Sequence, residues 1–182
     1  QIGLDSGEKI PHWIDSRDEI DADRVRPLPP LARERSQTDP RFRLIDTAEM
    51  VPDGGTHGLG YVRGRRVIDP DDWYFSCHFH RDPVMPGSLG VEAVIQGLQR
   101  FAVHSGLVRD SGDIVFAIPC EVRTGWRYRG QILRTDDEMS FELHVTGVTS
   151  NAGRVLLTAD ASVFKHSGGA GSTEPGLRIY EL

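Results

Sequence analysis

The chain has 182 residues, which is long enough for one sizeable domain and short for two. Its formal net charge is -6. The negative charge argues against a nucleic-acid-binding protein, because a phosphate backbone is bound by a continuous basic surface. No apolar run is long enough to span a membrane and no signal peptide is present, so we expect a cytoplasmic protein with no membrane contact.

Two stretches without periodicity flank the predicted folded unit. Residues 1–40 are expected to be a linker or N-terminal extension, because they include a run rich in Pro and Arg. Residues 167–182 are expected to be a Gly-rich segment and a C-terminal tail. The domain is therefore expected at residues 41–166. The chain begins at Gln1 and not at methionine, which predicts a segment of a longer polypeptide.

One helix and several strands are predicted within the domain. Apolar residues recur at helical spacing from Leu89 to about His104, and the small residue Gly97 allows close approach to this helix. Apolar and polar residues alternate at 141–145 and 155–163, and a hairpin signal separates the two runs. Further strands are expected at 115–118 and 126–133. A long helix against an antiparallel sheet is an α+β arrangement.

An ordered motif occupies residues 69–96. It contains Cys-His-Phe at 77–79, Asp-Pro-Val-Met-Pro-Gly at 82–87, and then Leu-Gly and an acidic residue, Glu92. The motif resembles that of the hot-dog β-hydroxyacyl-acyl-carrier-protein dehydratases of the 3-hydroxydecanoyl dehydratase/isomerase type. It is most similar to the dehydratase domains of polyunsaturated fatty acid and polyketide synthases. The resemblance implies a hot-dog fold, in which an antiparallel sheet wraps a long central helix.

The resemblance also implies an activity and a role for each residue of the motif. The expected reaction removes water from a 3-hydroxyacyl thioester on an acyl carrier protein and gives a 2-enoyl thioester. His78 is the expected base for the α-proton, and Glu92 is the expected acid for the departing hydroxyl. The backbone N–H of Gly87 is the candidate donor to the thioester carbonyl. Gln96, one helical turn after Glu92, is expected to orient the carboxyl group.

Substrate contacts are expected from two further regions. The motif implies contacts from Pro86 and Phe79. Arg127 and Arg129 alternate along the predicted strand at 126–133, which is compatible with a solvated strand face. It is equally compatible with a small basic patch that receives the phosphate of phosphopantetheine or an acidic carrier protein.

No cofactor and no metal are expected, other than the phosphopantetheine that carries the substrate. His80 lies two residues after His78, but no third metal ligand is evident. Cys77 and Cys120 give no disulfide framework, and we expect them to be buried apolar residues. Glu92 replaces the aspartate that is usual in the bacterial dehydratase/isomerases. Dehydration is therefore expected, while isomerisation of the double bond stays open.

The expected partners are an acyl carrier protein and a second hot-dog unit. The resemblance implies a homodimer or pairing with another hot-dog domain of the same polypeptide. Two other functions are compatible with the fold: a non-catalytic hot-dog module that completes a neighbour, and a hot-dog thioesterase. The motif favours a dehydratase over both of these functions. Acyl chain length, the geometry of the double bond and the parent synthase stay open.

Overall fold

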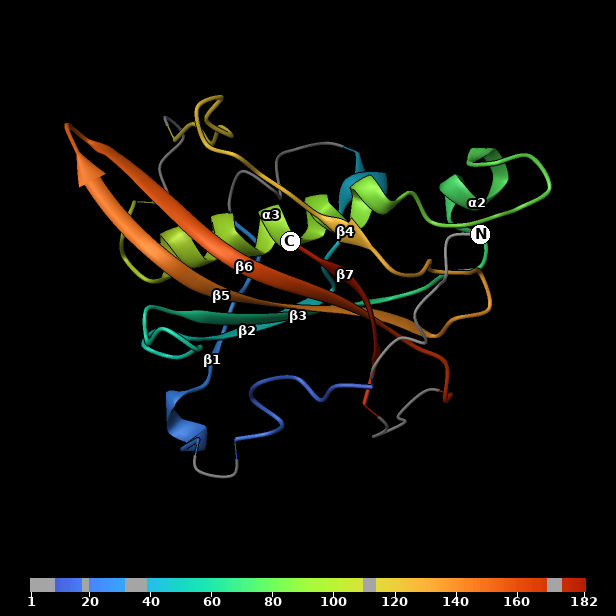
Figure 1. Ribbon diagram of the computed structural model, residues 1–182, viewed down its shortest axis with the longest axis horizontal. Coiled ribbons are helices and arrows are strands. Elements are labelled where there is room, and N and C mark those ends of the chain that lie inside the picture. The colour runs from blue at the N-terminus through green and yellow to red at the C-terminus, as the bar shows by residue number, and fades with distance from the viewer. Residues whose placement is uncertain (1–8, 18–19, 32–38, 110–113, 170–174) are drawn as a thin grey trace.

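The computed structural model describes residues 9–17, 20–31, 39–109, 114–169 and 175–182 (Figure 1). Within these ranges, seven strands form one antiparallel sheet in the order β1-β2-β3-β5-β6-β7-β4. The elements are, in chain order, η1 (Ala22–Arg24), β1 (Arg26–Pro27), η2 (Pro40–Phe42), β2 (Thr47–Val51), β3 (Tyr61–Val67), α2 (Trp73–Cys77), α3 (Gly87–His104), β4 (Arg127–Tyr128), β5 (Glu138–Asn151), β6 (Arg154–His166) and β7 (Leu177–Glu181). The long helix α3 contacts β3, β5 and β6, which confirms the predicted α+β hot-dog arrangement.

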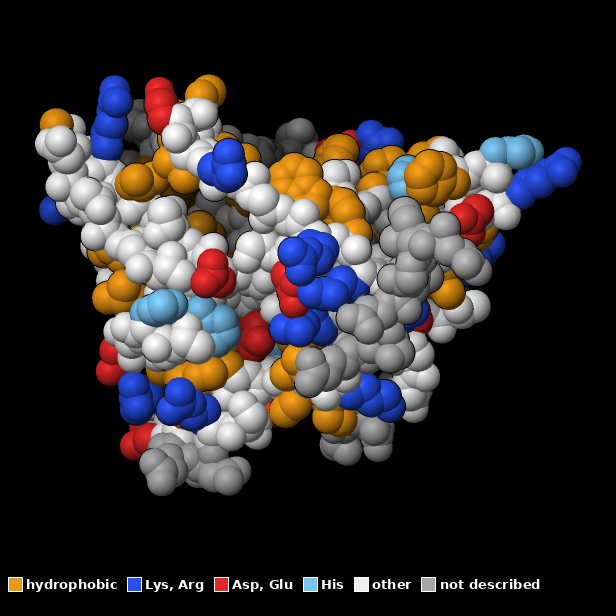
Figure 2. All heavy atoms as spheres, in the orientation of Figure 1, with side chains coloured by type: hydrophobic (Ala, Val, Ile, Leu, Met, Phe, Trp, Pro, Cys, Tyr) orange, Lys and Arg blue, Asp and Glu red, His pale blue; other side chains and the backbone are white. Residues whose placement is uncertain are grey.

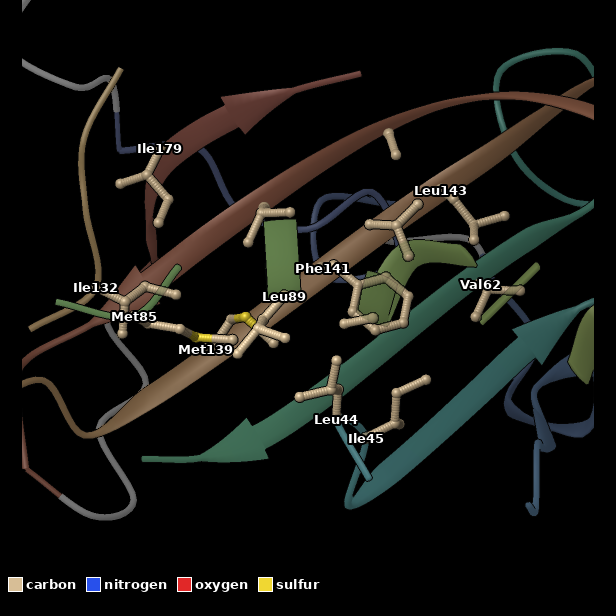
Figure 3. Close-up of a cluster of buried hydrophobic side chains, with 14 of the residues drawn as sticks. Leu44, Ile45, Val62, Met85, Leu89, Ile132, Met139, Phe141, Leu143 and Ile179 are labelled. Atoms are coloured by element: carbon tan, nitrogen blue, oxygen red, sulfur yellow. The ribbon is translucent and has the colours of Figure 1, made fainter. Parts of the chain in front are cut away.

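Helix α3 lies very close to the sheet because glycines leave room for an aromatic ring. A Cβ at Gly97 would lie 2.7 Å from Cε2 of Phe141, and a Cβ at Gly64 would collide with the same ring. Phe141 is fully buried and fills the space between α3 and β3, within the core drawn in Figure 3. The predicted close approach at Gly97 is confirmed.

The strands β5 and β6 form the long hairpin that the sequence predicts. Phe141, Leu143 and Val145 are all buried under α3, as their alternation indicates. The hairpin turns at Ala152 and Gly153, whose φ angles are 46° and 76°. Positive φ at both central residues gives the primed turn that matches the twist of the two strands.

Two of the predicted strands differ from the structure. Residues 115–118 form no ladder with any other described segment, and Val115 is 84% exposed. The predicted strand at 126–133 shortens to β4, followed by an isolated bridge between Leu133 and Val84. The prediction failed here because a short run of strand-forming residues shows only a local preference, and a ladder also needs a neighbouring strand.

The sheet extends beyond the predicted domain at both ends. Arg26 of β1 pairs with Met50 of β2, and Leu28 and Leu31 are buried. At the other end, β7 pairs with β6 and with β4. The boundaries at 41–166 stay a prediction, but residues outside them complete the sheet. Among the described residues, no helix has both the length and the apolar character needed to cross a membrane.

The face of β5 that points away from α3 is polar, and the N-terminal segment covers it (Figure 1). His12 is 3% exposed, and its Nε2 lies 2.7 Å from Oγ of Ser140. The backbone N–H of Trp13 donates to Oε2 of Glu142 at 2.7 Å, and the Tyr61 hydroxyl donates to the same oxygen at 3.1 Å. This cover explains why Glu142 is buried although the alternation places it on the outward side.

A fall in pH is expected to weaken the contacts between the N-terminal segment and β5, because Glu142 loses its negative charge. Burial raises the pKa of this carboxyl group, but the rings of His12 and His144, 3.6 Å and 3.8 Å from its oxygens, and the hydrogen bond from the Trp13 N–H outweigh burial and hold the pKa well below its usual range. A carboxylate with a lowered pKa stabilises the fold fully above the unfolded value of about 4.3, and this stabilisation is lost as the pH falls. We expect the free energy of unfolding to fall by about 1–3 kcal/mol between about pH 5 and pH 2 from this group.

Denaturant unfolding across that pH range measures the effect. The Glu142→Gln variant removes the titrating group while keeping its size, so its unfolding free energy should decline less with acid. A decline as steep as that of the unsubstituted chain would contradict this role of Glu142.

Candidate active site

The motif folds into a short helix, a loop and the start of a long helix. Helix α2 ends at Cys77, and the next residue, His78, caps it: the backbone N–H of His78 donates to the carbonyl of Tyr74 at 2.8 Å. The loop then passes through Phe79 and Arg81, which have φ angles of 59° and 64°. Such left-handed conformations are uncommon for residues other than glycine, and they reverse the chain within a few residues. The loop ends at Pro86, and α3 begins at Gly87.

His78 is half-buried, and the backbone fixes its orientation. Its Nδ1 lies 3.0 Å from the carbonyl oxygen of Val84. A carbonyl has no proton to give, so Nδ1 donates and the neutral ring carries its lone pair on Nε2. The ring of Phe79 packs beside it with the two centroids 4.2 Å apart, and Phe79 itself is 64% exposed.

Glu92 and Gln96 are brought together one turn apart on α3, as their spacing predicts. Nε2 of Gln96 donates to Oε1 of Glu92 at 3.1 Å and to the carbonyl oxygen of Phe42 at 3.1 Å. The backbone N–H of Leu44 donates to Oε1 of Gln96 at 3.4 Å. Because that N–H can only donate, it sets which way the amide group of Gln96 points. The amide N–H is therefore directed at the carboxyl group of Glu92.

The predicted base, His78, and the predicted acid, Glu92, belong to separate hydrogen-bond networks. Within the described ranges, no hydrogen bond or ion pair connects His78 with Glu92. His78 is bonded to the loop that precedes α3, whereas Glu92 is bonded to Gln96 inside that helix. The motif thus supplies both groups, but a single copy holds them in separate networks.

Gly87 is the first residue of α3, and Pro86 occupies the position before it. The N-terminus of a helix presents unpaired backbone N–H groups and a partial positive charge. The ring of Tyr128 covers the position where a side chain at residue 87 would stand: a Cβ there would lie 2.7 Å from Cζ of Tyr128. Sequence reasoning missed Tyr128, although it lies between Arg127 and Arg129 in the predicted strand.

The predicted arginines gather around one carboxylate. Nη2 of Arg129 donates to Oε2 of Glu181 at 3.0 Å, and Nη1 of Arg127 lies 3.9 Å from the same oxygen. Arg178 lies 3.1 Å from the other oxygen of Glu181. These guanidinium groups, Arg129 first, lower the pKa of Glu181. Figure 2 shows basic side chains gathered around the middle of the molecule, where β4 and β7 lie.

Other titratable residues do not join the site. His80 is exposed, and among the described residues no three His, Cys, Asp or Glu side chains are placed to hold a metal ion. The expectation that Cys77 and Cys120 are buried is wrong, because both are exposed. Cys77 is the last residue of the short helix α2, and Cys120 lies in the exposed segment before β4.

Comparison with known proteins gives two findings. A family model described as the FabA-like domain matches residues 37–168, which contain the whole motif. The chain is also 31% identical to a subunit of the polyunsaturated fatty acid synthase of Thraustochytrium sp.. That alignment covers 100% of this chain and 13% of the synthase polypeptide, so the chain spans only a small part of its relative's length.

Proposed function

The chain belongs to the FabA-like domain family, and on that premise we propose that it dehydrates a 3-hydroxyacyl thioester carried by an acyl carrier protein. The product is the 2-enoyl thioester. The observation that carries the proposal is the hydrogen bond between His78 Nδ1 and the carbonyl of Val84. It leaves the lone pair on Nε2, as a general base requires, and it holds the ring in one orientation.

The reaction begins at the α-carbon of the substrate. Nε2 of His78 takes the α-proton, and the electron pair of that C–H bond becomes the second bond between the α- and β-carbons. The bond from the β-carbon to its hydroxyl oxygen breaks, and the oxygen leaves as water. The backbone N–H of Gly87 donates to the thioester carbonyl oxygen, which carries negative charge while the α-proton departs.

Glu92 supplies the proton that converts the departing hydroxyl into water. Gln96 donates to Oε1 of Glu92, so Oε2 is the oxygen that carries and gives the proton. The contacts of Gln96 with Phe42 and Leu44 hold the amide, and through it the carboxyl group, in place. One proton then passes from His78 back to Glu92, which resets the pair for the next turnover.

The acid and the base meet when two hot-dog units pair. His78 and Glu92 belong to separate hydrogen-bond networks in one copy, which supports this arrangement, because dehydration needs both groups on one substrate. A two-fold interface between copies would place His78 of each copy beside Glu92 of the other. The exposed apolar side chain of Phe79 supports an interface at the motif, and further exposed apolar side chains lie in the segment that leads to β4: Val115, Ile118, Val122 and Trp126.

The basic patch at β4 and β7 is proposed to receive the carrier protein. Arg127, Arg129 and Arg178 all lie within 4 Å of the carboxylate of Glu181, and the side chain of Arg127 is 70% exposed, so it is accessible to an acidic partner. We expect Arg127→Glu to lower turnover of carrier-bound substrate about 5- to 10-fold by weakening encounter with an acidic partner. Turnover of a short pantetheine thioester should not change.

Arg154→Glu is the matched control, because Arg154 is an exposed arginine at the distant end of the long hairpin. It makes the same change of charge away from the patch. Equal losses on the carrier-bound and the short substrate in Arg127→Glu would contradict the docking role.

Mass measurement of the products tests the proposed reaction. The purified chain is incubated with a 3-hydroxyacyl pantetheine thioester and with the same group on a carrier protein. A thioester lighter by one water molecule is the expected product. Release of the free 3-hydroxy acid would instead indicate a thioesterase. No change of either substrate by a folded and paired sample would favour a non-catalytic module.

A further inference from the structure

The ring of Tyr128 takes the space that a side chain at residue 87 would need. An added Cβ at Gly87 would lie 2.7 Å from Cζ and 2.9 Å from the hydroxyl oxygen of Tyr128, and closer still to Cε1. Real Cβ atoms do not approach other heavy atoms so closely, so the ring and the Gly87 backbone are in direct contact. Gly87 therefore allows an aromatic ring to lie against the first residue of α3.

Two sets of backbone contacts hold Tyr128 at this place. On one side, Tyr128 pairs with Tyr180 of β7, and the next N–H, that of Arg129, donates to Ile179 at 2.7 Å. On the other side, the chain that follows β4 runs along the loop before α3, where Met85 N–H donates to the carbonyl of Ile132 at 2.9 Å.

The same loop holds His78. Val84, whose carbonyl accepts from His78, forms a bridge with Leu133. The segment that carries Tyr128 is thus tied to the loop that orients the proposed base and leads to Gly87.

The strand β4 presents different chemistry on its two faces. Successive side chains of a strand point to opposite sides. Arg127 and Arg129 share one side and contact Glu181, so Tyr128 points to the other side, toward Gly87. The ring is not part of the core, because Tyr128 is 46% exposed. Part of its surface stays accessible beside the start of α3.

We propose that the ring of Tyr128 is the wall against which the thioester group of the substrate packs. This inference rests on the proposed function, in which the Gly87 N–H binds the thioester carbonyl. A group bonded there lies beside Tyr128, and a polarisable sulfur makes favourable contacts with an aromatic ring. Tyr128 is a positioning residue: its ring surface places the thioester group, and its hydroxyl is not required.

Two substitutions separate the ring from the hydroxyl. Tyr128→Ala removes both, and Tyr128→Phe removes the hydroxyl alone. The probes are a 3-hydroxyacyl pantetheine thioester for kinetics, and the corresponding amide, with nitrogen in place of sulfur, for calorimetry. We expect Tyr128→Ala to raise the KM of the thioester and the Kd of the amide about tenfold, and Tyr128→Phe to stay within about twofold.

Leu156→Ala is the matched control, because Leu156 is a partly exposed apolar residue on the distant hairpin. It should change neither constant. Circular dichroism and denaturant unfolding show whether each variant is folded. Because Tyr128 is half-exposed at an edge strand, removal of its ring should leave the fold intact.

The outcomes separate this inference from the proposed reaction. If the unsubstituted chain turns over the thioester but Tyr128→Ala keeps its KM and Kd, the inference alone is overturned. Losses as large in Tyr128→Phe as in Tyr128→Ala would also overturn it. If the unsubstituted chain binds the amide without any turnover, the proposed reaction fails, and the ratio of Kd values still decides the role of Tyr128. If the unsubstituted chain neither binds the amide nor turns over the thioester, both the proposed reaction and the proposed role of Tyr128 are overturned.

Discussion

The His78→Ala substitution is expected to slow dehydration about 10²- to 10⁴-fold, because it removes the base that takes the α-proton. The loss should appear in kcat and in kcat/KM alike, since the proton transfer takes place in the transition state. Turnover of a 3-hydroxyacyl pantetheine thioester, followed by the mass of the product, measures it. The ring of His78 contacts the carbonyl of Val84 and the ring of Phe79. Unfolding curves must therefore accompany the kinetics.

His80→Ala is the matched control, because it removes an exposed histidine two residues further along the same loop. It should leave turnover within about twofold, since surface substitutions away from such contacts have small effects. Equal activities of the folded His78→Ala and His80→Ala variants would contradict a role for His78 as base.

Mixing two inactive variants is expected to restore activity. Glu92→Gln alone should lose about 10²- to 10⁴-fold, because an amide has no acidic proton to give. If each site takes His78 from one copy and Glu92 from the other, a mixed pair of His78→Ala and Glu92→Gln chains contains one intact site. With random exchange of copies, about a quarter of the unsubstituted activity should return.

The double variant carrying both substitutions provides the control for this experiment. When the double variant is mixed with His78→Ala, neither chain carries His78, so no intact site can form. This mixture should stay inactive. The variants are exchanged under mild denaturant, and pairing is checked by molecular mass in solution. A mixture of His78→Ala and Glu92→Gln that pairs but stays inactive would contradict the shared site between copies.

The periodic parts of this fold could be predicted from the sequence. Helix α3 and the hairpin of β5 and β6 are long, and their apolar residues follow one period over many positions. Gly97 also indicated the close approach that Phe141 completes. These features depend on local patterns, and local patterns are what a sequence displays.

The parts that depend on distant segments could not be predicted. The burial of Glu142 results from His12 and Trp13, which lie about 130 positions away in the chain. A stretch rich in Pro and Arg gives no sign that the residues before it cover a sheet. The segment at 115–118 has the composition of a strand but lacks a partner among the described residues, so it forms no ladder.

The residue types of the candidate site could be predicted, but their relations could not. The motif identifies His78 and Glu92, yet the hydrogen bond that selects the His78 tautomer is donated by Nδ1 to the backbone carbonyl of Val84, and the side chain of Val84 plays no part in it. Tyr128 was missed because the charges of Arg127 and Arg129 are the more conspicuous feature of that strand. Strand alternation offered the signal: if both arginines face outward, the tyrosine between them faces the helix.

The reverse reaction in labelled water tests the central claim most directly. A 2-enoyl pantetheine thioester is incubated with the chain in water that carries deuterium and the heavy isotope of oxygen. The account predicts a 3-hydroxyacyl thioester with deuterium on the α-carbon and heavy oxygen on the β-carbon, formed about 10²- to 10⁴-fold more slowly with His78→Ala. Heavy oxygen in the carboxylate of a released acid, with an unlabelled acyl chain, would show hydrolysis of the thioester and contradict a dehydratase.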